Sequence, residues 1–196
     1  MKNQPATRKI AVTAVFGALS ALLMFLEFSV PLMPGFIKLD FSDLPALIAA
    51  FAYGPLSGVI ICYMKNLIHL LFSGTLGVGE LSNFILSGIY AAVAGLVYRR
   101  FKTRRGALLG SLAGAAASAV LGVFSNYFLV YPLYAKLLMP VSAILGMYRT
   151  ILPGVQNLFM ALLIFNLPFT FVKGVLVAAI CFAIYKPLRP ILKGRA

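Results

Sequence analysis

Acidic residues are scarce in this sequence. Its 196 residues include four carboxylate side chains, those of Glu27, Asp40, Asp43 and Glu80. Paired-acid catalysis and two-metal chemistry need clustered carboxylates, so neither is supported. His69 is the single histidine, and one histidine without a carboxylate cluster does not make a metal site. We therefore expect no catalytic residue, no metal and no resident cofactor.

Cysteines and nucleotide-binding motifs are sparse too. The two cysteines, Cys62 and Cys181, both lie in apolar segments, which is typical of buried thiols rather than of a disulfide or metal framework. The phosphate-binding pattern G-x-x-x-x-G-K-[ST] does not occur, so the sequence contains no evident ATPase. Active uptake by such a protein would need energy from another subunit.

Apolar side chains, in contrast, are in excess. The composition is 62% hydrophobic and 11% charged, with a mean hydropathy of +0.99, whereas a soluble domain is roughly half apolar and one quarter charged. A membrane-spanning helix needs about 20 mostly apolar residues, so the chain has room for about five to seven spans and no soluble catalytic domain. These features predict an all-α integral membrane protein.

The net charge of +13 indicates topology rather than nucleic-acid binding, because basic residues gather in the cytoplasmic loops of membrane proteins. Most of them fall in three clusters: Lys2, Arg8 and Lys9; Arg99, Arg100, Lys102, Arg104 and Arg105; and Lys186, Arg189, Lys193 and Arg195. If all three clusters are cytoplasmic, an even number of spans separates each from the next, four and then two. This predicts six transmembrane helices with both termini cytoplasmic.

Six apolar segments fit that count. They cover about residues 10–30, 42–53, 55–72, 80–98, 107–130 and 158–185, in one transmembrane domain that takes in residues 1–196. The first is too long for a secretory signal and is interpreted as a retained span. The second is short for a bilayer core of about 30 Å, so we expect tilt or shielding by neighbours. Residues 131–153 are expected to form an outer loop with a short helix, and Pro168 to kink the last span.

Polar side chains in these spans are predicted to lie at one depth in the membrane. On the predicted orientation, four spans carry them in their outer halves or at the midplane: Lys65, Asn66 and His69; Glu80, Asn83 and Ser87; Asn126; and Asn166, Thr170 and Lys173. The inner halves are almost purely apolar. This pattern favours a binding site that opens outward over a channel, which needs polar lining throughout. Hydrogen bonding between helices is the alternative role for these groups.

Lys173 is the most demanding of these residues, since an ammonium at the midplane costs about 2.5–3.5 kcal/mol on insertion scales. It therefore needs a ligand or an ion-pair partner. Lys65 and Glu80 are candidates for a structural ion pair, and His69 for a packing role. Aromatic residues at the same level suit either an interfacial belt or an apolar slot for a ligand. They are Phe28, Phe36, Phe41, Phe84, Tyr127, Tyr131, Phe165 and Phe169.

Small residues form a stripe in the cytoplasmic half of the first span. The stripe comprises Ala11, Ala14, Gly17, Ala18 and Ala21. Small side chains let another helix approach closely. That helix belongs either to this chain or to an external partner.

Four segments carry a family resemblance. They read Lys38-Leu-Asp-Phe-Ser-Asp-Leu-Pro45, Lys65-Asn-Leu-Ile-His69, Gly77-Val-Gly-Glu-Leu-Ser-Asn83 and Asn166-Leu-Pro-Phe-Thr-Phe-Val-Lys-Gly174. Over nearly the whole chain, the sequence resembles the riboflavin-binding S components of energy-coupling-factor (ECF) transporters. The resemblance implies an S-component fold that captures riboflavin from outside, with flavin mononucleotide as a further candidate. It also implies that the loop after the first span closes over the site.

The resemblance assigns roles to particular residues. Ala14 and Ala18 would meet a transmembrane coupling subunit, the T component, which is served by two ABC ATPases. The substrate site implied by the resemblance and by polar depth together comprises Leu39, Glu80, Asn83, Asn126, Asn166, Thr170 and Lys173. The family often has asparagine where Thr170 stands. Membrane lipid is the remaining partner, and riboflavin is transported cargo rather than a cofactor.

Three alternatives remain open from the residues alone. An S component for thiamine, biotin or a pyridoxine-like vitamin would share the first span but need different polar chemistry. An intramembrane enzyme using Glu80 and His69 is disfavoured by the scarcity of acids. A purely structural membrane subunit would leave the cost of Lys173 unexplained.

Overall fold

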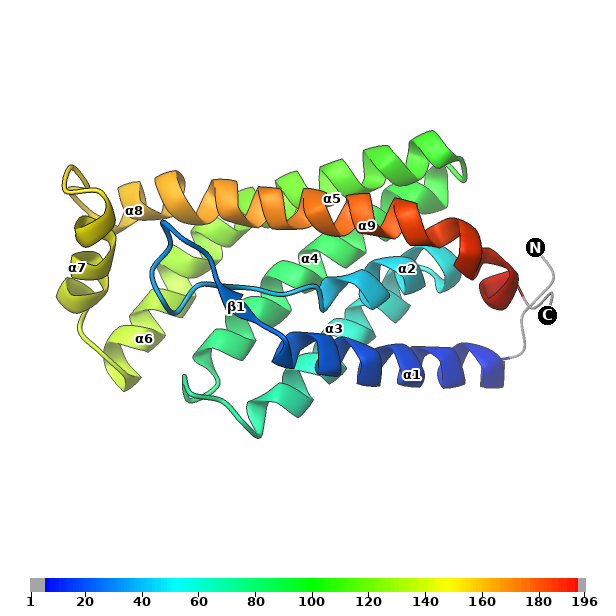
Figure 1. Ribbon diagram of the computed structural model, residues 1–196, viewed down its shortest axis with the longest axis horizontal. Helices are drawn as coiled ribbons and strands as arrows, with labels where there is room; N and C mark the ends of the chain where they lie inside the picture. The colour runs from blue at the N-terminus through cyan, green and yellow to red at the C-terminus, as the bar shows by residue number, and fades with distance from the viewer. Residues whose placement is uncertain (1–5, 194–196) are drawn as a thin grey trace.

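The computed structural model describes residues 6–193, with side chains described from Thr7 to Ile184. Long helices lie side by side along one axis, as Figure 1 shows. They are α1 (Ala6–Phe25), α2 (Asp43–Tyr53), α3 (Pro55–Leu70), α4 (Val78–Arg100), α5 (Arg104–Ser125) and α9 (Leu167–Lys193). Between α5 and α9 lie the short helices α6 (Tyr131–Leu137), α7 (Val141–Ile151) and α8 (Leu158–Ala161) and the π-helical turns η1 (Asn126–Val130) and η2 (Leu162–Asn166). Lys2 and Arg195 of the terminal basic clusters lie outside the described residues.

Among the described residues, four helical segments are long and apolar enough to cross a membrane. They are Thr7–Phe25, Val78–Arg100, Arg104–Leu137 and Leu158–Ile184. The helices α2 and α3 are shorter, with 11 and 16 residues, and join through Gly54 at a φ of 100°. The short second span expected from the sequence is therefore present as a short helix. The count of six spans stays a prediction.

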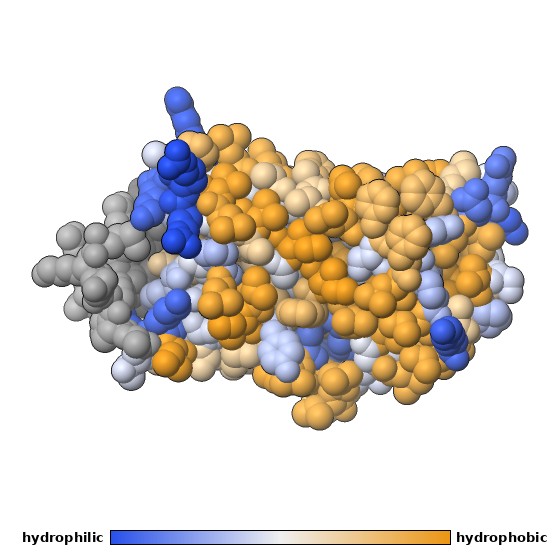
Figure 2. All heavy atoms as spheres, turned by 180° about the vertical axis from the view of Figure 1, so that it is seen from behind, coloured by the Kyte–Doolittle hydropathy of each residue, from blue (hydrophilic) through white to orange (hydrophobic). Residues whose placement is uncertain are grey.

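The surface has an apolar middle and polar ends. Hydrophobic side chains cover the broad central part in Figure 2, and hydrophilic side chains gather toward both ends. Large apolar side chains such as Leu22, Leu109 and Val172 are 64%, 59% and 52% exposed. Lipid tails would cover such a band without the penalty that water imposes, so the chain is an integral membrane protein.

The first helix ends earlier than predicted. We expected it to run to about Val30, but α1 stops at Phe25. The following residues turn back on themselves, because β1 (Phe28–Ser29) pairs antiparallel with β2 (Lys38–Leu39). Residues 26–42, called here the first outer loop, thus form a hairpin rather than an extension of the helix. In Figure 1 this hairpin lies between α1 and the α6–α7 end of the bundle.

The fifth apolar segment continues beyond its predicted end at residue 130. The helix α5 passes through η1 directly into α6, and α7 follows as a separate helix. The expected outer loop at residues 131–153 is therefore mostly helical.

Two prolines explain the two π-helical turns. Pro132 follows η1, and Pro168 follows η2, each two residues after the turn ends. A proline inside a helix cannot donate a hydrogen bond, and its ring clashes with the carbonyl group four residues earlier. Those carbonyls belong to Phe128 and Ile164, which lie inside the π turns, so the wider turn relieves the clash. The kink expected at Pro168 corresponds to this turn.

Glycines and alanines bring α4, α5 and α9 into close contact. A Cβ atom on Gly114 would lie 2.7 Å from the carbonyl oxygen of Tyr90, and one on Gly174 would lie 2.7 Å from the Cβ of Ala115. Side chains larger than hydrogen would force these helices apart. Backbone packing therefore closes the bundle beside these residues.

The small-residue stripe on α1 divides between two faces. Gly17 and Ala21 are buried, and a Cβ on Gly17 would lie 2.8 Å from the Cε of Met64 in α3. Ala14 and Ala18 are exposed. Packing within the chain therefore accounts for one part of the stripe and leaves the other part uncovered.

Candidate ligand-binding site

A cavity of about 150 Å³ lies among α4, η1, α6, η2, α9 and the first outer loop. One water needs only about 10–15 Å³ of such space, so the cavity is large enough for a small organic molecule. Phe36, Ile37 and Lys38 of the first outer loop line it. The loop therefore bounds the space that the helices enclose.

Five of the predicted site residues line this cavity. They are Asn83, Asn126, Asn166, Thr170 and Lys173. Asn126 is the first residue of η1, and Asn166 is the last residue of η2. A π-helical turn changes the direction in which side chains leave the helix, and such turns are frequent at functional sites. The two prolines thus position two amides on facing elements of one cavity.

Leu39 and Glu80 lie outside the cavity lining. Leu39 is 8% exposed in β2, one residue after the lining residue Lys38. The carboxylate of Glu80 instead holds the loop between α3 and α4. It contacts His69 Nδ1 at 2.8 Å, and accepts hydrogen bonds from Ser73 Oγ at 2.7 Å and Thr75 Oγ1 at 3.1 Å.

Lys65 does not pair with Glu80, the partner considered from the sequence. Its Nζ atom lies 2.6 Å from Asp43 Oδ1 and also donates a hydrogen bond to Ser42 Oγ. The Lys65 side chain is fully buried. It thus contacts the chain segment between β2 and α2, not the start of α4.

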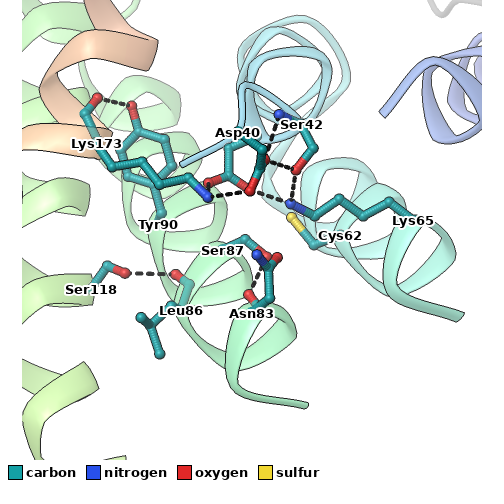
Figure 3. A network of polar contacts seen from close by, with 12 residues as sticks. Asp40, Ser42, Cys62, Lys65, Asn83, Leu86, Ser87, Tyr90, Ser118 and Lys173 are labelled. Atoms are coloured by element: carbon teal, nitrogen blue, oxygen red, sulfur yellow. Dashed lines mark hydrogen bonds and ion pairs between the residues drawn. The ribbon is translucent and has the colours of Figure 1, made fainter. Parts of the chain in front are cut away.

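Lys173 has the ion-pair partners that its depth requires. Its Nζ atom lies 2.8 Å from Asp40 Oδ2 and 3.7 Å from Asp43 Oδ2. In Figure 3, Lys173 and Lys65 approach from opposite sides, with Asp40 between them. The four charged residues Asp40, Asp43, Lys65 and Lys173 are called here the ionic anchor. They join the end of the first outer loop to α2, α3 and α9.

The ionic anchor is charge-balanced, with two ammonium groups and two carboxylates. Removing one member of a buried pair leaves an uncompensated charge and costs several kcal/mol. Burial would raise the pKa of Asp40, but the charges of Lys173 and Lys65 outweigh it and hold that pKa well below its usual range. The backbone N–H of Ser42 donates to Asp40 Oδ1 at 2.8 Å and also favours the ionised form.

Aromatic side chains hold the opposite end of the cavity. The ring of Phe36 lies 6.1–6.2 Å, between centroids, from the rings of Tyr131, Tyr134 and Tyr148. These four residues are called here the aromatic anchor. Tyr148 donates a hydrogen bond to Asn166 Oδ1 at 2.7 Å, and Asn166 Nδ2 donates to Tyr131 at 3.3 Å. The hydrogen bonds fix the Asn166 amide beside the cavity.

The sequence arguments missed several residues at this site. Asp40, Asp43 and Tyr148 were not predicted as site residues, although both aspartates stand in the first of the four resembling segments. A buried lysine that needs a counter-charge was the available signal, because few acidic residues could supply one. No such signal existed for Tyr148, since its role depends on how α7 packs.

The arrangement suits recognition of a planar, polar, uncharged organic molecule. Aromatic and aliphatic groups line the cavity together with amides, hydroxyls, the carboxylate of Asp43 and the ammonium groups of Lys38 and Lys173. An ammonium has three donors, and the carboxylates of Asp40 and Asp43 face two of those of Lys173. Within residues 6–193, no group of three histidine, cysteine, aspartate or glutamate residues is arranged to hold a metal.

Comparison with protein families gives one match over most of the chain. The family described as "ECF transporter, substrate-specific component" matches residues 8–185.

Curated relatives are similar over nearly their whole length. The riboflavin transporter RibU of Staphylococcus aureus is 27% identical over 191 residues, which cover 97% of this chain and 95% of the relative. The riboflavin transporter FmnP of Bacillus subtilis is 28% identical over 187 residues, which cover 93% of this chain and 93% of the relative. The riboflavin transporter RibU of Streptococcus thermophilus is 31% identical over 193 residues, with 95% of this chain and 85% of the relative covered.

A solved structure has the same fold. Its description reads "Structure and mechanism of the S component of a bacterial ECF transporter". The two chains superpose with a TM-score of 0.75 at 27% sequence identity, and 95% of this chain and 98% of the solved chain are covered.

Proposed function

The chain belongs to the substrate-specific components of ECF transporters, and from this premise we propose that it captures riboflavin outside the cell for ATP-driven import. Three relatives that match almost from end to end are named riboflavin transporters. The observation that carries the proposal is the cavity beneath the first outer loop. It combines aromatic surface with the polar groups of Asn126, Asn166, Thr170 and Lys173.

The chemistry of riboflavin matches that lining. Its isoalloxazine ring is flat and largely apolar, and would pack among Phe36, Tyr131 and Phe169. The ring heteroatoms and ribityl hydroxyls need hydrogen-bond partners in a buried site. Asn126, Thr170 and Lys173 would supply them.

Leu39 and Glu80 each lie next to a cavity-lining residue and could reach a ligand after a local movement. Leu39 lies next to the cavity, so its backbone is available to a ligand after a small movement of the first outer loop. Glu80 follows the cavity-lining Gly79 and is held by the loop between α3 and α4. Its carboxylate would reach a ligand only if the hydrogen bonds from Ser73 and Thr75 opened. Asn83 lines the cavity directly.

The topology proposed for the domain has six spans and cytoplasmic termini. The N-terminal end of α1, the C-terminal end of α9 and the turn from α4 to α5 lie at one end of the bundle in Figure 1. That turn carries the strongest basic cluster, including Arg99, Arg100 and Arg105. Basic residues favour the cytoplasmic side, so the cavity would face outward.

Partner subunits would supply the energy for transport. We assign Ala14 and Ala18, which are exposed on α1, to contact with the T component. Small side chains allow the close helix approach that such a contact needs. Two ABC ATPases would bind and hydrolyse ATP on the cytoplasmic side. Binding and release of riboflavin need no covalent chemistry in this chain.

The absorption spectrum of the purified protein tests the proposal. The protein is prepared in detergent from cells grown in rich medium, and the visible absorption band of bound flavin is measured. Protein freed of ligand is then titrated with riboflavin while flavin fluorescence is recorded, with thiamine and biotin as competitors. The proposal predicts one flavin per chain, and quenching that neither competitor reverses.

Other results would change the ligand assigned to the chain. A colourless protein that also fails to quench riboflavin fluorescence contradicts the riboflavin proposal. Binding of thiamine or biotin in its place would make the chain an S component for another vitamin.

A further inference from the structure

Helix α3 contacts residues of the site from outside the cavity, through Lys65 and through Asn66, whose amide donates a hydrogen bond to Asn83 Oδ1 at 3.4 Å. No residue of Pro55–Leu70 lines the cavity, yet Lys65 of this helix is fully buried and reaches the ionic anchor. A buried ammonium that does not face the ligand is costly in a membrane. Its contacts with Asp43 and Ser42 therefore indicate a role for the charge and not for side-chain volume alone.

The contacts of Lys65 extend to the cavity. Lys65 holds Asp43 Oδ1 at 2.6 Å, and the other oxygen of that carboxylate faces Lys173 at 3.7 Å. Through Ser42, Lys65 also reaches Asp40, because the Ser42 hydroxyl donates to Asp40 Oδ1. Both carboxylates that hold Lys173 are thus oriented from their far side by Lys65, as Figure 3 shows for Asp40.

We propose that Lys65 is a positioning residue for riboflavin recognition, which keeps Lys173 available to the ligand by neutralising and orienting Asp43 and Asp40. This inference rests on the proposed function and extends it to a residue that does not line the cavity. With Lys65 present, each ammonium group has one carboxylate to balance. Without it, two carboxylates compete for Lys173 alone, and the lysine is drawn away from the ligand.

Lys65→Met tests the consequence for affinity, because methionine keeps most of the length of lysine and loses the charge. We expect riboflavin binding to weaken about tenfold, since both carboxylates would then bind Lys173. The matched control is Lys136→Met, the same substitution at an exposed lysine of α6, which should bind riboflavin as the parent does.

The double variant Lys65→Met/Asp43→Asn separates positioning from structural support. It removes one positive and one negative charge, leaving Lys173 balanced by Asp40. Positioning predicts that the double variant binds riboflavin at least about threefold more tightly than Lys65→Met. A purely structural role predicts further loss, because a second buried contact is removed.

The pH profile gives an independent readout. The charged or titratable groups around Asp40 and Asp43 are Lys65 and Cys62 from α3, Lys173 from α9 and Tyr90 from α4. Lys65 is one of the two charges that lower the pKa of Asp40, so its removal lets that carboxyl take up a proton more readily. Protonation would restore the charge balance. Riboflavin affinity of Lys65→Met should therefore rise at a higher pH than any change in the parent, as the medium is acidified toward the ordinary pKa of a carboxyl group.

The outcomes are distinct. A parent that does not bind riboflavin contradicts the proposed function and this inference with it. A parent that binds, together with a Lys65→Met variant of equal affinity, contradicts this inference alone. If Lys65→Met does not fold, Lys65→Gln replaces it in the comparison, because glutamine loses the charge but keeps a polar end that can bond to Ser42. The double variant Lys65→Gln/Asp43→Asn should then bind more tightly than Lys65→Gln, and weaker binding overturns the inference.

Discussion

The first outer loop is held at two places, by apolar packing at one and by ion pairs at the other. Near its middle, Phe36 packs among the tyrosines of the aromatic anchor. At its end, Asp40 is bound by Lys173 in the ionic anchor. Apolar packing is non-directional and weakens gradually as shape is lost. A buried ion pair depends on geometry and charge balance, and fails when one partner is removed.

The difference indicates which anchor controls recognition. The aromatic anchor closes the cavity and tolerates changes that keep apolar volume. The ionic anchor places a charged group of α9 at the cavity and connects it to a loop 133 residues away in sequence. Changes to the ionic anchor should therefore affect affinity more than changes to the aromatic anchor.

Removing Lys173 should have the largest effect. Lys173→Ala deletes a proposed ligand contact and leaves Asp40 and Asp43 with one remaining cation. Truncating one partner of a buried charge pair costs about 2–5 kcal/mol, so riboflavin affinity should fall by about 100-fold or more. Fluorescence titration measures it, with Lys136→Ala as the control. Parent-like binding by Lys173→Ala would show that the ionic anchor has no role in recognition.

Truncating Phe36 should have a smaller effect. Phe36→Ala removes the ring that packs on three tyrosines, and aromatic pairs contribute about 0.5–1.5 kcal/mol beyond area burial. We expect about tenfold weaker binding, mainly through faster dissociation of riboflavin, measured by stopped-flow fluorescence. Phe36→Leu should recover part of the loss. Phe128→Ala, at a ring that is 72% exposed, is the matched control. An effect as large as that of Lys173→Ala would reverse the ranking of the two anchors.

Removing the Tyr148 hydroxyl should affect stability more than affinity. Tyr148→Phe keeps the ring contacts and leaves the Asn166 amide oxygen without its donor, at a cost of about 1–3 kcal/mol. Burial raises the pKa of Tyr148, so the phenol stays protonated as a donor at neutral pH. The midpoint of thermal unfolding in detergent should fall, and riboflavin affinity should change only a few-fold. Tyr127→Phe, in the exposed part of η1, should change neither quantity.

Moderate acid should have the smallest effect. A carboxyl group with a lowered pKa contributes stability above its ordinary pKa, and loses it only as the pH falls through the lowered value. The pKa of Asp40 lies well below its usual range, so the pair with Lys173 stays ionised from pH 8 to pH 5. Riboflavin affinity should vary less than about twofold over this interval. A steep loss near pH 6 would show that another group controls the site.

The sequence predicted which polar residues come together better than it predicted their contacts. Polar spacing along the apolar segments placed Asn126, Asn166 and Lys173 at one level, and all three line the cavity. The same reasoning showed that Lys173 needs a partner. It did not identify Asp40, because residues so far apart in sequence are brought together only by the packing of the loop against α9.

Local conformation was the harder part to predict. The end of α1 was placed too late, because apolar composition alone does not reveal that Phe28 pairs with Leu39 in a hairpin. Pro168 was predicted to kink the last span. The π turn that precedes it forms because the helix continues on both sides of the proline, which the sequence did not reveal. Glu80 was predicted as a site residue, and the hydroxyls of the preceding loop bind its carboxylate, so its contact with the ligand stays a prediction.

The position of bound riboflavin in an experimentally determined structure of this protein tests the central claim most directly. The account predicts the isoalloxazine ring inside the cavity beneath the first outer loop, with ligand atoms within hydrogen-bonding distance of Lys173 Nζ and the Asn126 amide. It also predicts that Asp40 and Lys65 keep their contacts. Riboflavin bound elsewhere, for example in the exposed groove lined by Phe124, Tyr127 and Phe159, would contradict it.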